Sequence, residues 1–274
     1  MVKTALVTGA SSGMGREIAL RLAADGYTVY GAARRVERMR DLEESGVRVI
    51  GMDVTVDDQV VAAVDRVIAE TGRIDVLVNN AGFGLYGAVE DTSMDDVRYQ
   101  FEVNFFGVAR LTQLVLPHMR AQESGRIVNI SSMGGEIYTP LGAYYHATKH
   151  ALEAWSDALR YEVAPFGIDV VIVQPGIIES EWSGIMAAPI MERSGHGAYA
   201  DLARSVVENS ERTYSEGGSG GSAPTVISDT VAKAVAAKRP RTRYAAGRMA
   251  KPLITARRLL SDRAFDRLLR SATR

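Results

Sequence analysis

The chain opens on Thr4-Ala5-Leu6-Val7-Thr8-Gly9-Ala10-Ser11-Ser12-Gly13-Met14-Gly15, a short apolar run followed by a glycine-rich turn. A helical pattern comes next, with Ile18, Leu20 and Leu22 among charged residues. Glycines let a backbone turn tightly and approach a pyrophosphate, to which a helix N-terminus offers free N–H groups and partial positive charge. The spacing is G-x-x-x-G-x-G, and a lone glycine loop is often only a turn. Its place between a strand and a helix nevertheless predicts a nucleotide site.

The same strand–turn–helix pattern repeats along the chain. Short apolar strands are expected over 5–7, 27–30, 47–50, 76–78, 126–130 and 168–173, and helices over 57–70, 95–120 and 143–164. This alternation indicates a parallel sheet covered by helices on both faces, that is, a Rossmann-type doubly wound α/β fold. With 274 residues, 46% of them hydrophobic, the chain can bury one large core, so we expect a single domain over 1–274.

The regular pattern ends after Pro175-Gly176. Residues 177–227 mix aromatics, methionines, glycines and charges, and we expect an irregular apolar region that closes over a substrate as a lid. Surface irregularity without a function is the alternative. We interpret the glycine-serine stretch 216–222 as a loop inside the domain, because the residues after it are too few for an independent core. Ser228-Asp229 predicts a cap, with a helix over about 229–238.

The C-terminal segment is strongly basic. From Lys238 to Arg274 it holds twelve Lys/Arg against two aspartates, a net charge of about +10, whereas residues 1–237 carry about −11. Apolar residues recur at helical spacing between these arginines, so 250–274 is expected to be a basic amphipathic tail that forms a C-terminal helical extension. We favour its packing on its own domain or a neighbouring subunit over peripheral contact with an anionic membrane. Ser261-Asp262 is expected to split it into two short helices.

Composition excludes several kinds of site. The chain has no cysteine, which excludes disulfides, thiol nucleophiles and cysteine metal sites. His146 and His150 are four residues apart, but no H-E-x-x-H surrounds them, so no metal is expected. No signal-peptide region precedes the first strand and no apolar run is long enough to cross a bilayer, so we expect a cytoplasmic protein. The basic tail carries no recognition motif for nucleic acid.

The ends of the second and third strands indicate which nucleotide binds. NAD sites usually place an acid after the second strand to bond the ribose 2′-OH, whereas a cation accommodates a 2′-phosphate. Ala33 stands where an acid could, and Arg34 and Arg35 come next, which favours NADP(H) over NAD(H). Two solvated arginines at the start of a helix are the alternative. Asp53, after the third strand, is suited to accept a bond from the adenine amino group, with a turn or helix cap as its alternative role.

Tyr145 and Lys149 are four residues apart and therefore share one face of a helix. An ammonium beside a phenol favours the phenolate, so we expect the pKa of Tyr145 to fall toward working pH and the pair to exchange a proton with an alcohol or ketone. Ser132, thirteen residues upstream, can bond the same substrate oxygen. Y-x-x-x-K alone is often a surface pair, but a nucleotide signature opens the same chain. Ser131 and Tyr144 adjoin these residues; the spacing selects Ser132, and Tyr144 is expected to pack.

Together these motifs resemble the short-chain dehydrogenase/reductase family over about residues 3–180. The resemblance implies the catalytic residues Asn104, Ser132, Tyr145 and Lys149. It implies a cofactor site made of Thr8, Gly9, Ser11, Ser12, Gly13, Met14, Gly15, Arg34, Arg35, Asp53, Val54, Asn80, Ala81, Gly82, Tyr145, Lys149, Pro175, Gly176, Ile178 and Ser180. The family often has threonine at position 180, and serine keeps the hydroxyl. Ser132-Met133-Gly134-Gly135 and the arginine pair are similar to 17β-hydroxysteroid and retinol dehydrogenases.

The resemblance implies hydride transfer between NADP(H) and a hydrophobic ketone, aldehyde or secondary alcohol. In reduction, Tyr145 would donate the proton and Ser132 would polarise the carbonyl; Lys149 would lower the tyrosine pKa and bond the nicotinamide ribose, and Asn104 would support Lys149 through water. The pocket is expected above the carboxyl ends of the strands. Its candidate lining is Phe83, Leu85, Met133, Ile137, Tyr138, Leu141, Trp182, Met186 and Met191.

Two further expectations concern assembly and the alternative function. We expect a homodimer or homotetramer. The alternative to an enzyme is a catalytically silent NADP(H)-binding sensor or scaffold module. The presence of all four catalytic positions in the sequence favours the enzyme.

Overall fold

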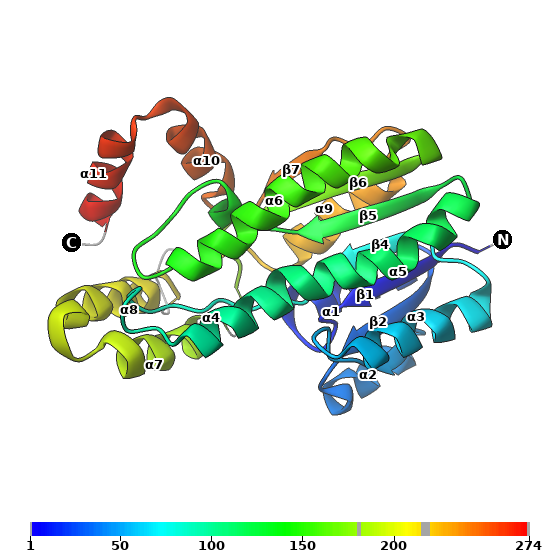
Figure 1. Ribbon diagram of the computed structural model, residues 1–274, viewed down its shortest axis with the longest axis horizontal. Helices are drawn as coiled ribbons and strands as arrows, with labels where there is room; N and C mark the ends of the chain where they lie inside the picture. The colour runs from blue at the N-terminus through cyan, green and yellow to red at the C-terminus, as the bar shows by residue number, and fades with distance from the viewer. Residues whose placement is uncertain (1, 180–181, 215–219, 273–274) are drawn as a thin grey trace.

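A seven-stranded parallel sheet in the order β3-β2-β1-β4-β5-β6-β7 forms the centre of the molecule (Figure 1). The computed structural model describes residues 2–179, 182–214 and 220–272, with the backbone alone for 182–186, 214 and 272. The strands are β1 (Thr4–Thr8), β2 (Thr28–Ala33), β3 (Arg48–Gly51), β4 (Val76–Asn79), β5 (Gly125–Ile130), β6 (Ile168–Pro175) and β7 (Arg243–Ala246). The predicted doubly wound α/β fold is confirmed.

Helices cover both faces of this sheet. They are α1 (Gly13–Ala24), α2 (Arg40–Glu44), α3 (Asp57–Thr71), α4 (Met94–Phe101), α5 (Gly107–Ala121), α6 (Ala143–Val163), α7 (Trp182–Ser194), α8 (Ala200–Tyr214), α9 (Thr225–Ala236), α10 (Ala250–Leu259) and α11 (Asp262–Ala272). α1 and α9 pack on one face, and α3, α5 and α6 pack on the other (Figure 1). Alternate residues of β1 point to opposite faces, so Ala5 and Val7 join the first core and Leu6 the second.

The strand order reverses at β1, which has β2 on one side and β4 on the other. Ligands of open α/β sheets bind outside the carboxyl ends of the strands at such a point. Thr8 and Asn79 end β1 and β4 there, Ser132 comes just after β5, and Pro175 ends β6. The motifs found in the sequence therefore lie along one edge of the sheet.

The second half of the chain differs from the prediction at three places. Residues 177–227, expected to be irregular, contain the two helices α7 and α8. The next helix begins at Thr225, after Pro224, rather than at 229, and Ser228 lies inside it. β7 was not predicted, because Arg243-Tyr244-Ala245-Ala246 has weak strand propensity and is extended through its pairing with β6.

Two helical additions flank the carboxyl edge. The helix pair α7–α8 packs through Ile190 and Ala203 on Ala88 and Leu141. Residues 250–272, here called the arm, form α10 and α11 and are split near Ser261, as predicted. The arm buries Ile254 and Phe265 within the chain, and its contact with a neighbouring subunit or a membrane stays a prediction. In Figure 1 the two additions lie on either side of the N-terminal end of α6.

None of the helices in the described part of the chain is long and apolar enough to span a bilayer.

Candidate functional site

The glycine loop between β1 and α1 has the shape that a diphosphate requires. A Cβ on Gly15 would lie 2.2 Å from the Gly9 carbonyl oxygen, so only glycine lets α1 approach β1 this closely. Gly13 has a φ of 51°, and a Cβ there would meet no described atom within 4 Å. Within the described part of the chain, Ser12 makes no side-chain cap, so it leaves the first amides of α1 to a ligand. Met14 packs against the core.

The N-N-A-G segment after β4 is bonded to this loop. Thr8 Oγ1 accepts hydrogen bonds from the backbone N–H groups of Asn80 and Ala81, both at 3.0 Å. Asn80 Nδ2 donates to the Thr8 carbonyl oxygen at 2.9 Å. A Cβ on Gly82 would come within 3.2 Å of Asn104 Oδ1. The segment therefore runs from the nucleotide loop to the predicted catalytic residues.

The two arginines after β2 have different partners. Arg35 Nη2 donates to Ser12 Oγ at 3.4 Å and lies 3.5 Å from Ser11 Oγ. Arg34 Nη1 donates to the Tyr99 hydroxyl at 2.7 Å. A guanidinium and two hydroxyls therefore gather beside the glycine loop at Arg35, which is a suitable donor set for a phosphate monoester. This arrangement fits the expected 2′-phosphate.

Asp53 lies in a turn after β3. Its Oδ1 accepts from the Thr55 N–H at 2.9 Å and from the Thr55 hydroxyl at 2.8 Å. These bonds stabilise the turn, which is the alternative role expected for Asp53. Its Oδ2 lies 3.9 Å from Arg34 Nη1. The carbonyl oxygen of Val54 would come within 2.7 Å of a Cβ on Gly107, so this turn packs on the start of α5. The adenine contact of Asp53 and Val54 stays a prediction.

Three of the predicted catalytic side chains meet near the end of β5 and the start of α6. Tyr145 and Lys149 lie one turn apart on α6, and Ser132 is the N-cap of the short helix η3 (Met133–Gly135). The Ser132 and Tyr145 side chains are hydrogen-bonded to each other. Lys149 Nζ lies 6.0 Å from the Tyr145 ring centroid and donates to the Ile130 carbonyl oxygen at 2.9 Å. The structure thus brings a serine–tyrosine pair and a buried amine together.

Asn104 lies in a wide turn of the helix that runs from α4 to α5. Residues 102–106 form a π-helical turn, a feature frequent at functional sites. Asn104 Oδ1 accepts from the Phe83 N–H at 3.0 Å, and its Nδ2 donates to the Phe83 carbonyl oxygen at 2.9 Å and to Thr148 Oγ1 at 3.1 Å. The side chain ties the segment after β4 to α6, one residue from Lys149. The water-mediated support of Lys149 stays a prediction.

Burial decides the protonation of Tyr145 and Lys149 in the protein alone. It raises the pKa of Tyr145 to about 12, and the hydrogen bond with Ser132 opposes this only in part. It lowers the pKa of Lys149 to about 8, against the pull of the Glu153 carboxylate. The expected fall of the Tyr145 pKa is therefore wrong for the protein alone, because desolvation of the phenol outweighs the hydrogen bond with Ser132. A protonated tyrosine can act as a proton donor.

Ser131 and Ser132 point to different neighbours. Ser132 Oγ accepts from the Gly134 N–H at 3.0 Å in addition to its bond with Tyr145. The Ser131 side chain is buried beside Glu153, where burial raises the pKa of the carboxyl and the serine hydroxyl opposes this rise. Of the two serines, Ser132 is the one beside the tyrosine.

His146 was considered in the sequence only as a metal ligand, but it contacts the catalytic segment. A Cβ on Gly134 or Gly142 would lie 2.8 Å from a ring nitrogen. The Thr139 N–H donates to Nε2 at 2.9 Å, so Nδ1 carries the proton and donates to the Gly134 carbonyl oxygen at 3.0 Å. Burial lowers the His146 pKa to about 4, so the ring is neutral near pH 7 and ties residues 133–142 to α6. Gly134 and Gly142 were the signal in the sequence for a close contact here, but the sequence alone does not show that this contact is with His146.

The turn after β6 is packed closely on the backbone that precedes the arm. A Cβ on Gly176 would lie 2.0 Å from the Arg248 carbonyl oxygen, so glycine is required there. Pro175 ends β6, and the Ile178 side chain is buried in the core. At Ile178 this turn can therefore offer only backbone groups to a nicotinamide. Ser180 lies outside the described residues.

The apolar residues expected around a substrate fall into three groups. Those buried in the protein core are Leu85, Ile137 and Leu141. Those half-buried are Phe83, Met133, Tyr138 and Met191. The side chains of Trp182 and Met186 lie outside the described part of the chain. The half-buried side chains expose more surface to a substrate than the buried ones.

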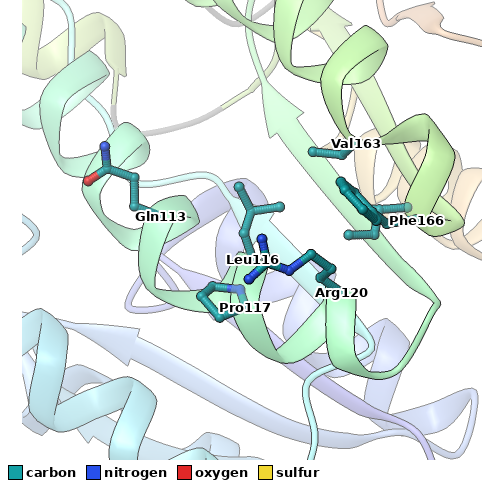
Figure 2. Close-up of a pocket in the computed structure, with 7 residues that line it drawn as sticks. Gln113, Leu116, Pro117, Arg120, Val163 and Phe166 are labelled. Atoms are coloured by element: carbon teal, nitrogen blue, oxygen red, sulfur yellow. The ribbon is translucent and has the colours of Figure 1, made fainter.

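A cavity of about 260 Å³ lies elsewhere, between α5 and the end of α6 (Figure 2). It is lined by Gln113, Leu116, Pro117, Arg120, Val163, Phe166 and Ile168. Because Val163 ends α6 and Ile168 begins β6, the cavity lies at the amino end of β6, away from Tyr145. We therefore do not assign it to the candidate site. Among the described residues, no three His, Asp or Glu side chains gather as a metal site would require.

Comparison with known proteins adds the family context. The family profile described as short chain dehydrogenase matches residues 3–188. The 3-ketodihydrosphingosine reductase of Bacteroides thetaiotaomicron is 40% identical over 247 residues, 88% of this chain and 87% of that protein. The NADPH-dependent 3-dehydrocapnine reductase of Ornithobacterium rhinotracheale is 31% identical over 278 residues, 97% of this chain and 96% of that protein.

Solved structures agree with these relatives. A short-chain dehydrogenase from Streptomyces avermitilis has a TM-score of 0.79 and 37% identity, covering 99% of this chain and 98% of that chain. A closed serine dehydrogenase complexed with NADP+ has a TM-score of 0.75 and 25% identity, covering 88% and 92%. None of these four relatives is named a 17β-hydroxysteroid or retinol dehydrogenase, so they do not support that narrower resemblance.

Proposed function

The chain belongs to the short-chain dehydrogenase/reductase family of oxidoreductases, and from that premise we propose that it is an NADPH-dependent reductase of long-chain ketones. The observation that carries the proposal is the hydrogen-bonded pair of Ser132 and Tyr145 after β5, with the buried Lys149 beside it. The glycine loop opens two strands away in the same sheet. A protonated Tyr145 suits reduction of a carbonyl rather than oxidation of an alcohol near pH 7.

NADP(H) is supported by this chain and by its relatives. Arg35, Ser11 and Ser12 present a cation and two hydroxyls, and Ala33, Arg34 and Arg35 at the end of β2 include no carboxylate that would select NAD(H). One relative is NADPH-dependent by name, and one related structure contains NADP+. When bound, NADPH supplies the hydride. The glycine loop and Arg35 would bind its phosphates.

At the carbonyl, each side chain has one task. The Ser132 hydroxyl donates a hydrogen bond to the carbonyl oxygen and polarises it. The Tyr145 hydroxyl gives its proton to that oxygen as negative charge develops there. Lys149 is protonated below a pH of about 8, and its charge stabilises the tyrosinate that remains. Asn104 positions the segment after β4 against Thr148, next to Lys149.

The substrate class is inferred from the relatives and from the lining. Two relatives that match most of this chain are named as reductases of 3-ketodihydrosphingosine and 3-dehydrocapnine. The half-buried lining residues Phe83, Met133, Tyr138 and Met191 are all apolar or aromatic. These observations favour a ketone on a long apolar chain, and 3-ketodihydrosphingosine is the first compound to test.

The test measures NADPH absorbance with purified protein and ketones of increasing chain length, including 3-ketodihydrosphingosine in detergent micelles. We expect NADPH oxidation with the long-chain ketones and the corresponding alcohol by mass spectrometry. Ser132→Ala should lose most of this turnover, whereas Ser131→Ala, a matched deletion of the neighbouring hydroxyl, should lose far less. A protein that binds NADPH but reduces no ketone would contradict the proposal and support a silent binding module.

We also propose that the protein forms a homodimer or homotetramer. Three aromatic side chains on or next to α5 and α6 are exposed: Phe106 at 50%, Tyr161 at 86% and Phe166 at 41%. Exposed aromatic groups of this size are enriched at protein interfaces. Light scattering over a range of concentrations tests the proposal, and a monomer throughout the range would contradict it.

A further inference from the structure

The arm packs on the segment that joins Ser132 to Tyr145. This bridging segment, residues 133–142, includes Tyr138, whose hydroxyl donates to Asp266 Oδ1 at 2.7 Å across 128 positions of the chain. Arg258 Nη2 donates to Glu136 Oε1, also at 2.7 Å. The first bond joins the bridging segment to α11 and the second joins it to α10. Two charged residues of the arm therefore hold one short stretch of the active-site edge.

Apolar contacts surround the first of these bonds. The Phe265 ring is fully buried and lies 5.3 Å from the Tyr138 ring, nearly edge to face. The Arg257 guanidinium lies 5.6 Å from the centroid of each ring. Arg257 is fixed in turn by Asp262, at 2.9 Å. Tyr138 is thus held by a phenylalanine, an arginine and an aspartate of the arm.

The bridging segment is also held from α6. His146 accepts from the Thr139 N–H, so the residue next to Tyr138 is bonded to the helix that carries Tyr145. At its far end, Leu141 packs against the helix pair α7–α8. The bridging segment therefore contacts the arm, α6 and the helix pair. Figure 1 shows the arm and the helix pair on opposite sides of the N-terminal end of α6.

We propose that the arm is the element that selects the substrate by chain length. Phe265, Arg257 and Asp266 fix the position of Tyr138, so the bridging segment forms one wall of the pocket in which the apolar chain lies. Phe265 is fully buried and acts through Tyr138, as a positioning residue. This inference rests on the proposed function and names the part of the protein that gives it specificity.

The test compares variants that remove the same contact from its two ends. Tyr138→Phe and Asp266→Leu each delete the hydrogen bond, and Phe265→Leu weakens the ring contact. Arg263→Gln, at an exposed arginine of α11, is the matched control. The measurements are kcat and KM for ketones of increasing chain length, the NADPH dissociation constant by fluorescence and the melting temperature.

We expect both hydrogen-bond variants to lower kcat/KM for the longest ketone about tenfold and for the shortest ketone much less. The NADPH dissociation constant should not change, and Arg263→Gln should keep the selectivity of the wild type. The double variant should be no worse than the singles, because both remove one bond. An equal loss for every chain length that tracks the melting temperature would overturn the proposal, as would unchanged selectivity.

A binding measurement separates this inference from the proposed reaction. A fluorescent long-chain ketone is titrated into wild type, Asp266→Leu and Arg263→Gln in the presence of NADP+. We expect weaker binding only in Asp266→Leu, even if wild type reduced no ketone and the proposed function had failed. Equal binding by all three proteins would overturn the role of the arm, even with an active wild type.

Discussion

The nucleotide loop and the bridging segment of this protein are held in place by different kinds of contact. The loop is fixed through backbone atoms, because Gly15 packs on the Gly9 carbonyl oxygen. The bridging segment is fixed through side chains from distant parts of the chain, such as the bond between Tyr138 and Asp266. A backbone contact restricts a position to glycine, whereas a side-chain contact can be replaced by another pair. The nucleotide loop is therefore constrained by main-chain geometry, and the bridging segment can be changed by substitution in pairs.

The largest expected effect is at Tyr145, where the two regions meet. Tyr145→Phe removes the proton donor and leaves the nucleotide loop intact, so turnover should fall by about 10²- to 10⁴-fold with NADPH binding retained. Steady-state rates and a fluorescence titration measure the two properties. Residual activity above about a tenth of wild type would contradict the role of Tyr145 as the proton donor. Loss of NADPH binding would contradict the independence of the nucleotide loop from Tyr145.

The burial of Lys149 should lower the free energy of unfolding at neutral pH. Its pKa is about 8 in the folded protein against an ordinary value of 10.5, so between these values the unfolded chain binds a proton that the folded protein has lost. The contribution of Lys149 to the free energy of unfolding is therefore lowest below pH 8, and it rises by up to about 3 kcal/mol as the pH approaches 10.5. Lys149→Met should unfold at higher urea than wild type at pH 7, and the difference should shrink by pH 10. The same difference at both pH values would refute this.

Substitution of Arg35 should change the cofactor preference and leave the ketone selectivity unchanged. Arg35→Asp should reduce the preference for NADPH over NADH about ten- to hundredfold, because it removes a charge-assisted phosphate contact. Arg34→Asp, which removes the arginine bonded to Tyr99, should shift the preference less. Ketone selectivity should stay constant in both variants. A larger shift in Arg34→Asp would assign the phosphate contact to Arg34 instead of Arg35. Equal binding of both cofactors by wild type would refute the preference for NADPH.

The smallest effects are expected at His146, in the bridging region. Asn can replace the Nδ1 donor to Gly134, and Gln can replace the Nε2 acceptor for Thr139. His146→Gln loses the bond to the Gly134 carbonyl oxygen, and the Gly134 N–H is bonded to Ser132, so we expect about a tenfold loss of kcat. In His146→Asn we expect mainly a higher KM. NADPH binding should be unchanged. Identical kinetics in the two variants would show that the histidine only fills space.

The difference between the regions also explains what the sequence could predict. The glycine loop, the arginine pair and the catalytic positions are local motifs, and their physical requirements can be seen within a few residues. The contact between Phe265 and Tyr138, the ring of His146 between two glycines and the pairing of β7 all depend on chain segments meeting in space. The direction of the Tyr145 pKa belongs to this second group, because burial rather than sequence distance to Lys149 decides it.

The bond between Tyr138 and Asp266 also sets an order of events during protein synthesis. The ribosome releases the nucleotide loop first and residues 257–266 long after the bridging segment that they hold. A nascent chain can therefore fold its glycine loop before the arm holds the bridging segment. If the proposals above are right, proteolytic removal of the arm after β7 returns the molecule to that stage, and we expect a product that still binds NADPH but has lost its selectivity for long chains.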